Sequence, residues 1–124
     1  MNIPANLKYT TDHEWLQLDG NIATIGITDF AQSQLGDIVF VDVQTEGEAL
    51  SQGDIFGAIE AVKTVADGLM PVSGKVVEFN SALESAPESV NKDPYGAGWM
   101  IKVEISNPSE IDSLLDSEAY KAIL

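Results

Sequence analysis

A single lysine, Lys63, stands within Gly57–Gly68 in a setting where its amine could serve covalent chemistry. Apolar β-forming residues run up to Lys63 and resume after it, which predicts a hairpin over about residues 55–72. Strands this apolar bury at least one face, whereas the turn stays in water because its amides need solvent partners. Lys63 is therefore predicted at or beside an exposed turn. An exposed amine on a stiff support is what covalent attachment of a mobile group requires.

An exposed lysine on a turn is also an ordinary surface feature. In this chain cations are scarce, because Lys and Arg total 6, all of them lysines, against 20 Asp and Glu. The neighbourhood of Lys63 is more informative. Glu60 lies three residues before it, Asp67 lies four after it, and the turn Pro71-Val72-Ser73-Gly74 closes the second strand. These neighbours favour a special role for Lys63.

Other site chemistries find little support in the sequence. There is no cysteine, which excludes thiolate metal sites and a cysteine nucleophile. No loop shows the alternating Asp/Asn and glycine pattern of a calcium site, no serine stands in a G-x-S-x-G elbow, and neither Lys63 nor Lys75 completes a phosphate-binding loop. The only histidine, His13, is expected to be a hydrogen-bonded structural residue. We expect no metal and no catalytic site, and hence no enzyme.

The bulk composition indicates one folded domain spanning residues 1–124. Hydrophobic residues make up 44% of the chain and charged residues 21%. A net charge of −14 would repel nucleic acid and anionic membrane surfaces, so neither is an expected partner. No apolar run approaches a membrane span, and the first residues have no signal-peptide pattern. The expected location is a bacterial cytoplasm.

The elements that must hold Lys63 in place are mostly strands. The β-branched run Ile38–Val43 is predicted to be a central strand, and the alternation after Ile101 predicts a half-buried one. The remaining predicted strands are 22–27, which follows a turn at Asp19-Gly20, and 75–79. The pattern indicates a small barrel or sandwich.

Three short helices are predicted around these strands. Thr28 is a candidate N-cap for a helix that ends at Gly36, and Ser81 has the spacing of a capping box. Residues 91–98 look like a loop. A final helix is predicted from about residue 108, with Ile111, Leu114 and Leu115 inward and a bend at Asp116-Ser117, as a cover for an open sheet edge.

Several separated motifs, in order along nearly the whole chain, resemble the H-protein family of the glycine cleavage system. These motifs are His13-Glu14-Trp15, Gly26-Ile27-Thr28, Leu35 to Val41, Glu60-Ala61-Val62-Lys63, Pro71 to Gly74, Val90-Asn91, Pro94-Tyr95-Gly96 and Gly98 to Ile101. Ala61 and Thr64 depart from the serine and alanine common at these family positions, which bears on recognition by a given ligase. Biotin carriers, with methionines beside the lysine, and 2-oxoacid dehydrogenase lipoyl domains, without the flanking motifs, match less well.

The resemblance implies a fold, a cofactor and partners. The implied fold is all-β with short helices, a flattened barrel-sandwich hybrid like lipoyl and biotinyl domains. The implied cofactor is lipoate in amide linkage on Lys63, which makes the chain a carrier. This is the same amine that the predicted hairpin exposes. The implied partners are a pyridoxal-phosphate glycine decarboxylase, a tetrahydrofolate-dependent aminomethyltransferase, dihydrolipoyl dehydrogenase and the lipoylating enzymes, all served by a monomer.

The resemblance also gives roles to acidic residues. In this family the lipoyl-lysine arm, once it carries the aminomethyl group, ends in an amine and is sheltered in a surface cleft. We therefore expect Glu14 and Asp67 near that amine, with Asp12 adding to the negative electrostatic field. Glu60 is expected to be recognised by the lipoylating enzyme. Two other functions stay open: a relay that hands octanoyl or lipoyl groups to other lipoyl domains, and an unmodified acidic interaction module.

Overall fold

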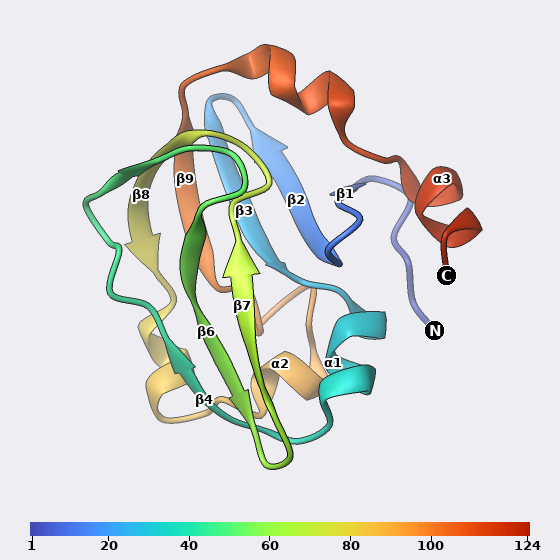
Figure 1. Ribbon diagram of the computed structural model, residues 1–124, viewed down its shortest axis with the longest axis vertical. Coiled ribbons are helices and arrows are strands. Elements are labelled where there is room, and N and C mark those ends of the chain that lie inside the picture. Colours follow the sequence, from blue (N-terminus) through green and yellow to red (C-terminus); the bar gives the residue numbers. More distant parts are fainter.

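The computed structural model describes all of residues 1–124 and consists mainly of two antiparallel sheets (Figure 1). The larger sheet has the strand order β1-β2-β3-β9-β8-β5. Its strands are β1 (Lys8–Tyr9), β2 (Glu14–Asp19), β3 (Ile22–Ile27), β9 (Ile101–Ile105), β8 (Gly74–Phe79) and β5 (Ala49–Leu50). The smaller sheet has the order β4-β6-β7, with β4 at Ile38–Asp42, β6 at Ile55–Ala61 and β7 at Val65–Leu69.

The main hydrophobic core lies between the two sheets, because strand alternation aims one face of each toward the other. From the larger sheet come Ile25, Ile101 and Val103, all fully buried, and from the smaller sheet come Phe56 and Ile59. The alternation predicted for β9 is confirmed, since Lys102 and Glu104 lie on its more exposed side. The expected all-β fold with short helices is confirmed.

Strand β4 corrects one prediction. Its β-branched sequence indicated a central strand, but it forms an edge of the three-stranded sheet, paired only with β6. Val39 and Phe40 are 52% and 42% exposed. High β-propensity reports fit to a pleated surface and does not distinguish an edge from the centre.

The first helix confirms its predicted caps. Helix α1 covers Asp29–Leu35, the Thr28 hydroxyl accepts a hydrogen bond from the Ala31 amide, and Gly36 follows with φ of +80°. The second helical segment is a single 3-10 turn, η1 (Ser81–Glu84), and its cap is Asn80 rather than Ser81. The expected loop over 91–98 is wrong at its start, because helix α2 spans Ser89–Lys92.

The C-terminal segment is not one helix with a bend at Asp116-Ser117 but two helical pieces, separated by extended backbone that begins at Leu114. A 3-10 segment, η2 (Pro108–Ser113), gives way to extended backbone at Leu114, and helix α3 (Ser117–Ala122) follows. Leu115 pairs with Tyr9 of the edge strand β1 through two backbone hydrogen bonds of 2.8 Å. The segment therefore covers a sheet edge, as predicted. No helix is both long and apolar enough to cross a membrane.

Candidate functional site

Lys63 lies in the turn between β6 and β7, which projects at one end of the molecule (Figure 1). The last strand pair before the turn is Glu60 opposite Val65, and the Ala61 amide donates to the Thr64 carbonyl at 2.8 Å. Lys63 is exposed, and its neighbour Val62 is 76% exposed. The predicted hairpin and the exposed amine at its tip are confirmed.

The turn is braced by the loop between α1 and β4. The Val62 amide donates to the Asp37 carbonyl at 3.0 Å, which ties the turn to that loop. The Asn91 side chain of α2 holds the loop on both sides, accepting from the Ile38 amide at 2.9 Å and donating to the Gly36 carbonyl at 2.8 Å. The support of Lys63 therefore runs through three elements that are distant in sequence.

Gly36 also leaves room for the lysine stem. A Cβ at position 36 would lie 3.6 Å from Cε of Lys63, so the aliphatic part of the side chain passes over this glycine. The φ of +80° at Gly36 is a left-handed value that favours glycine. Residue 36 thus ends α1 and borders the lysine at once.

A cleft of about 180 Å³ lies beside the hairpin, between β6–β7 and α1. Its apolar lining comes from Ile27, Phe30, Ala31, Leu35, Ile59 and Ala66. Its polar lining comes from Asp12, His13, Glu14, Gln34 and Asp67. A mostly apolar groove with a few carboxylates suits an extended aliphatic chain that ends in a cation.

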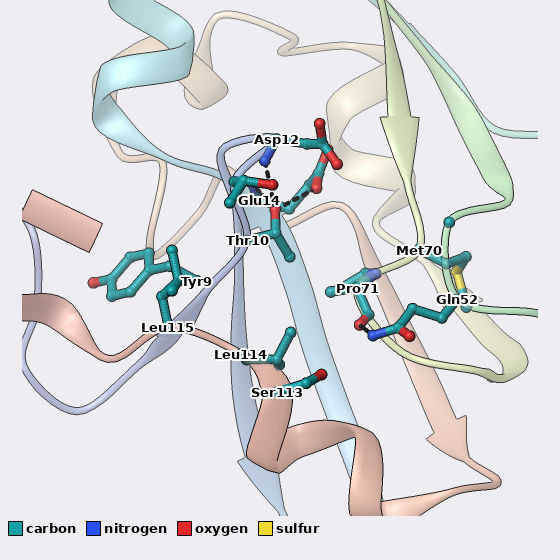
Figure 2. A pocket seen from close by; sticks show the side chains of 12 residues that line it. Tyr9, Thr10, Asp12, Glu14, Gln52, Met70, Pro71, Ser113, Leu114 and Leu115 are labelled. Carbon is teal, nitrogen blue, oxygen red and sulfur yellow. Dashed lines mark hydrogen bonds between the residues drawn. The ribbon is translucent and has the colours of Figure 1, made fainter. Parts of the chain in front are cut away.

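Glu14 is the buried carboxylate of this cleft, with only 2% of its surface exposed. Thr10 Oγ1 accepts hydrogen bonds from the amides of Asp12 and Glu14, so its own proton is directed to Glu14 Oε1 at 2.7 Å (Figure 2). The Leu69 amide donates to Glu14 Oε2 at 3.3 Å. Burial raises the pKa of Glu14 to about 7, although these hydrogen bonds oppose the shift.

Glu14 also borders a second cavity, of about 240 Å³ (Figure 2). That cavity lies against η2 and the residues that follow β7, including Leu114 and Pro71. Asp12 and Glu14 line both hollows, so the segment 12–14 forms the partition between them.

His13 holds this partition in place. Its backbone has a φ of +70°, a left-handed value that non-glycine residues seldom adopt. Its Nδ1 lies 2.8 Å from the Tyr120 hydroxyl, which lies 2.7 Å from Oγ1 of Thr28. The expectation of a hydrogen-bonded structural histidine is confirmed. Burial lowers the pKa of His13 and favours the neutral ring.

The structure separates the acidic residues selected from the sequence into two groups. Glu14, Asp67 and Asp12 line one cleft, with Asp12 and Asp67 exposed and Glu14 buried. Asp67 sits at the rim, because it pairs with Ala58 and alternation places it on the face of β7 opposite to Ala66. Glu60 does not line the cleft and lies half-buried, between Phe40 and Val65.

Sequence reasoning missed the roles of Thr10 and Asn91. Thr10 acts through a hydrogen bond to Glu14 across a tight turn, and Asn91 was assigned to a loop. The available signal for Asn91 was its place in the motif Val90-Asn91, which carried part of the family resemblance.

Comparison with known proteins identifies close relatives. The family model described as "Glycine cleavage H-protein" matches residues 7–124. The glycine cleavage system H proteins of Bacteroides fragilis and Bacteroides thetaiotaomicron are 60% and 57% identical over 124 residues, which is all of this chain and 98% of each relative. That of Symbiobacterium thermophilum is 57% identical over 121 residues, or 98% of this chain and 94% of the relative.

A solved structure has the same fold. The crystal structure of a glycine cleavage system H protein from Mycobacterium marinum superposes with a TM-score of 0.85 at 37% sequence identity, covering 97% of both chains. The flattened barrel-sandwich expected from the sequence is confirmed by this likeness.

Proposed function

The chain belongs to the glycine cleavage H-protein family, and on that premise we propose that it is a lipoyl carrier with lipoate in amide linkage on Lys63. The observation that carries this proposal is the exposed Lys63 at the tip of the β6–β7 hairpin, next to the cleft. The residues fit the group. The tip leaves the amine open to an acylating enzyme, and the apolar walls beside it match an aliphatic chain.

When bound, lipoate supplies the disulfide that takes up an aminomethyl group from glycine and is afterwards reoxidised, chemistry for which the chain has no cysteine. The chain's own residues hold and shield the arm. Ile59 and Phe30 give the cleft apolar walls that exclude water from an aliphatic chain. Glu14 supplies a carboxyl group inside the cleft, whose ionised form is favoured when a terminal ammonium group approaches, and Asp67 supplies a carboxylate at the rim, which attracts the same group.

On this proposal the chain is a cosubstrate of several enzymes rather than a catalyst. Its partners are a pyridoxal-phosphate glycine decarboxylase, a tetrahydrofolate-dependent aminomethyltransferase, dihydrolipoyl dehydrogenase and the enzymes that lipoylate Lys63. Its location is the bacterial cytoplasm, and it works as a monomer. The charge of −14 supports brief encounters with several partners, because surface charges steer association more than they tighten it.

The test is the intact mass of the protein isolated from its native cells, followed by peptide mapping. The expected result is one lipoyl increment, located on the peptide that contains Lys63. An unmodified mass in cells supplied with lipoate would contradict the proposal and favour an unmodified acidic interaction module.

A further inference from the structure

The outer face of the three-stranded sheet carries a row of exposed side chains next to the lysine tip. Phe40 of β4 pairs with Glu60 of β6, and Glu60 pairs with Val65 of β7. Directly paired residues share one face of a sheet, so these three side chains form one row, which we call the outer row. In the next pairs along the strands, Val41 and Ile59 are buried in the core, and Ala66 lines the cleft.

The outer row and the tip beside it expose large apolar side chains. Phe40 is 42% exposed and Val65 is 59% exposed, and Val62 at the tip adds a side chain that is 76% exposed. On the other side of the tip lies α1, whose exposed residues Ser33 and Gln34 are polar. A protein that contacts the tip therefore meets exposed apolar side chains at the outer row and polar ones on the outer surface of α1.

A hollow of about 320 Å³ continues from the outer row at Phe40 toward η1 and the end of β8. Phe40 and Phe79 give it two aromatic walls, and Asp42 and Glu84 give it carboxylates. Between residues 38 and 70 the only cationic residue is Lys63 itself. The lining suits a lysine or arginine side chain, whose stem packs on the rings while its charge meets the carboxylates.

We propose that the outer row and this hollow are the docking surface for the enzyme that acylates Lys63, through apolar residues rimmed by lysine or arginine. The inference rests on the proposed function, because such an enzyme must bring the Lys63 amine into its own site. In the step itself the neutral amine attacks the carbonyl carbon of a lipoyl adenylate. A C–N bond forms, the bond from that carbon to the phosphate oxygen breaks, AMP leaves, and the nitrogen releases a proton.

The surface decides affinity, so its loss acts on KM and leaves the chemistry at Lys63 intact. The test measures acylation of the apo protein by a purified lipoate–protein ligase with lipoic acid and ATP, over a range of acceptor concentrations. Phe40→Ser and Val65→Thr are each expected to raise the KM for the acceptor about fivefold or more with kcat nearly unchanged. Added NaCl is expected to raise the wild-type KM, since the partner contributes cations.

The matched control is Leu18→Thr, which removes a side chain that is 43% exposed on β2. The β2–β3 turn lies at the opposite end of the molecule from the β6–β7 turn (Figure 1), so this variant is expected to behave like wild type. Thermal unfolding checks that each variant is folded, and Val62→Thr replaces any variant that is not. If Phe40→Ser and Val65→Thr were acylated with wild-type KM, the docking surface would be wrong while the proposed function stood. Failure of the wild-type chain to be acylated at Lys63 would overturn both.

Discussion

Glu14 is the residue whose chemistry conflicts most with its surroundings. Burial raises its pKa from 4.5 to about 7, so the folded protein holds a proton that the unfolded chain releases well below neutral pH. A raised carboxyl pKa means that stability is greatest below the unfolded value and falls as the pH rises through the folded value. The window for this loss is about pH 4.5 to 7.

Replacing Glu14 with glutamine should remove this loss, because the amide stays neutral at every pH. A rise of the pKa from 4.5 to about 7 corresponds to about 3 kcal/mol of unfolding free energy. The difference in free energy of unfolding, Glu14→Gln minus wild type, is therefore expected to increase by up to about 3 kcal/mol from pH 4.5 to pH 8. Urea unfolding at several pH values measures it. Parallel profiles for the two proteins would show that Glu14 is not buried as described.

The two cleft carboxylates should differ in how well they protect a loaded arm. Glu14 is inside the cleft in a low-dielectric setting, whereas Asp67 is at the exposed rim, where solvent screens its charge. Glu14→Ala is expected to shorten the hydrolytic lifetime of the aminomethylated arm about tenfold, and Asp67→Ala less. The lifetime follows from release of formaldehyde by the isolated loaded protein. Unchanged lifetimes in both variants would remove these residues from the arm's docking site.

At the residue scale the sequence identified the exposed lysine of the hairpin but not the residues that support it. Lys63 stood out because cations are scarce and β-formers flank it. The burial of Glu14 could not be predicted, since it depends on Thr10 and the Leu69 amide meeting around one carboxylate. His13 was assigned correctly in kind, but its partner Tyr120 lies 107 residues away in the chain.

Among the elements, α2 has a role out of proportion to its four residues. Its Asn91 carries hydrogen bonds to the Ile38 amide, the Gly36 carbonyl and the Gln32 side chain. In this loop, the Asp37 carbonyl accepts a hydrogen bond from the Val62 amide beside Lys63. The lysine turn is therefore only as rigid as this polar contact.

Loss of the Asn91 side chain should loosen the lysine turn. Asn91→Ala leaves a half-buried amide and carbonyl without their partners, which is expected to lower the free energy of unfolding by about 2 kcal/mol. The Val62 amide should also exchange with solvent faster, as measured by native-state hydrogen exchange. Asn21→Ala, which removes one contact to the Ile105 carbonyl on the larger sheet, is the control and should leave Val62 unchanged. Equal protection of the Val62 amide from hydrogen exchange in Asn91→Ala and wild type would contradict the claim that Asn91 holds the lysine turn in place.

Sequence patterns predicted elements better than their places in the fold. Alternation located β9, and caps located α1, because these signals are local. The edge position of β4 and the break at Leu114 were missed. Both are set by distant contacts, since β4 pairs with β6 alone and Leu115 leaves the helical path to pair with Tyr9.

For the whole molecule, the two sheets form a closed apolar core that leaves one hairpin free to project (Figure 1). Near the tip, the exposed apolar residues Phe40 and Val65 lie on one face of the smaller sheet. A stiff scaffold, a projecting lysine and an apolar cleft with a buried carboxyl group are the features expected of the proposed lipoyl carrier.

The most direct test of the role of Lys63 is the rate of glycine oxidation in a system reconstituted from the purified partner enzymes. Three versions of this chain are first exposed to the lipoylating enzyme, and their rates are then compared. Wild type and Lys75→Arg, which changes an exposed lysine on β8, are expected to sustain the same rate and to gain one lipoyl group. Lys63→Arg keeps the charge but cannot form the amide, so it should gain none and fall to the background rate. Full glycine oxidation with Lys63→Arg would contradict the account.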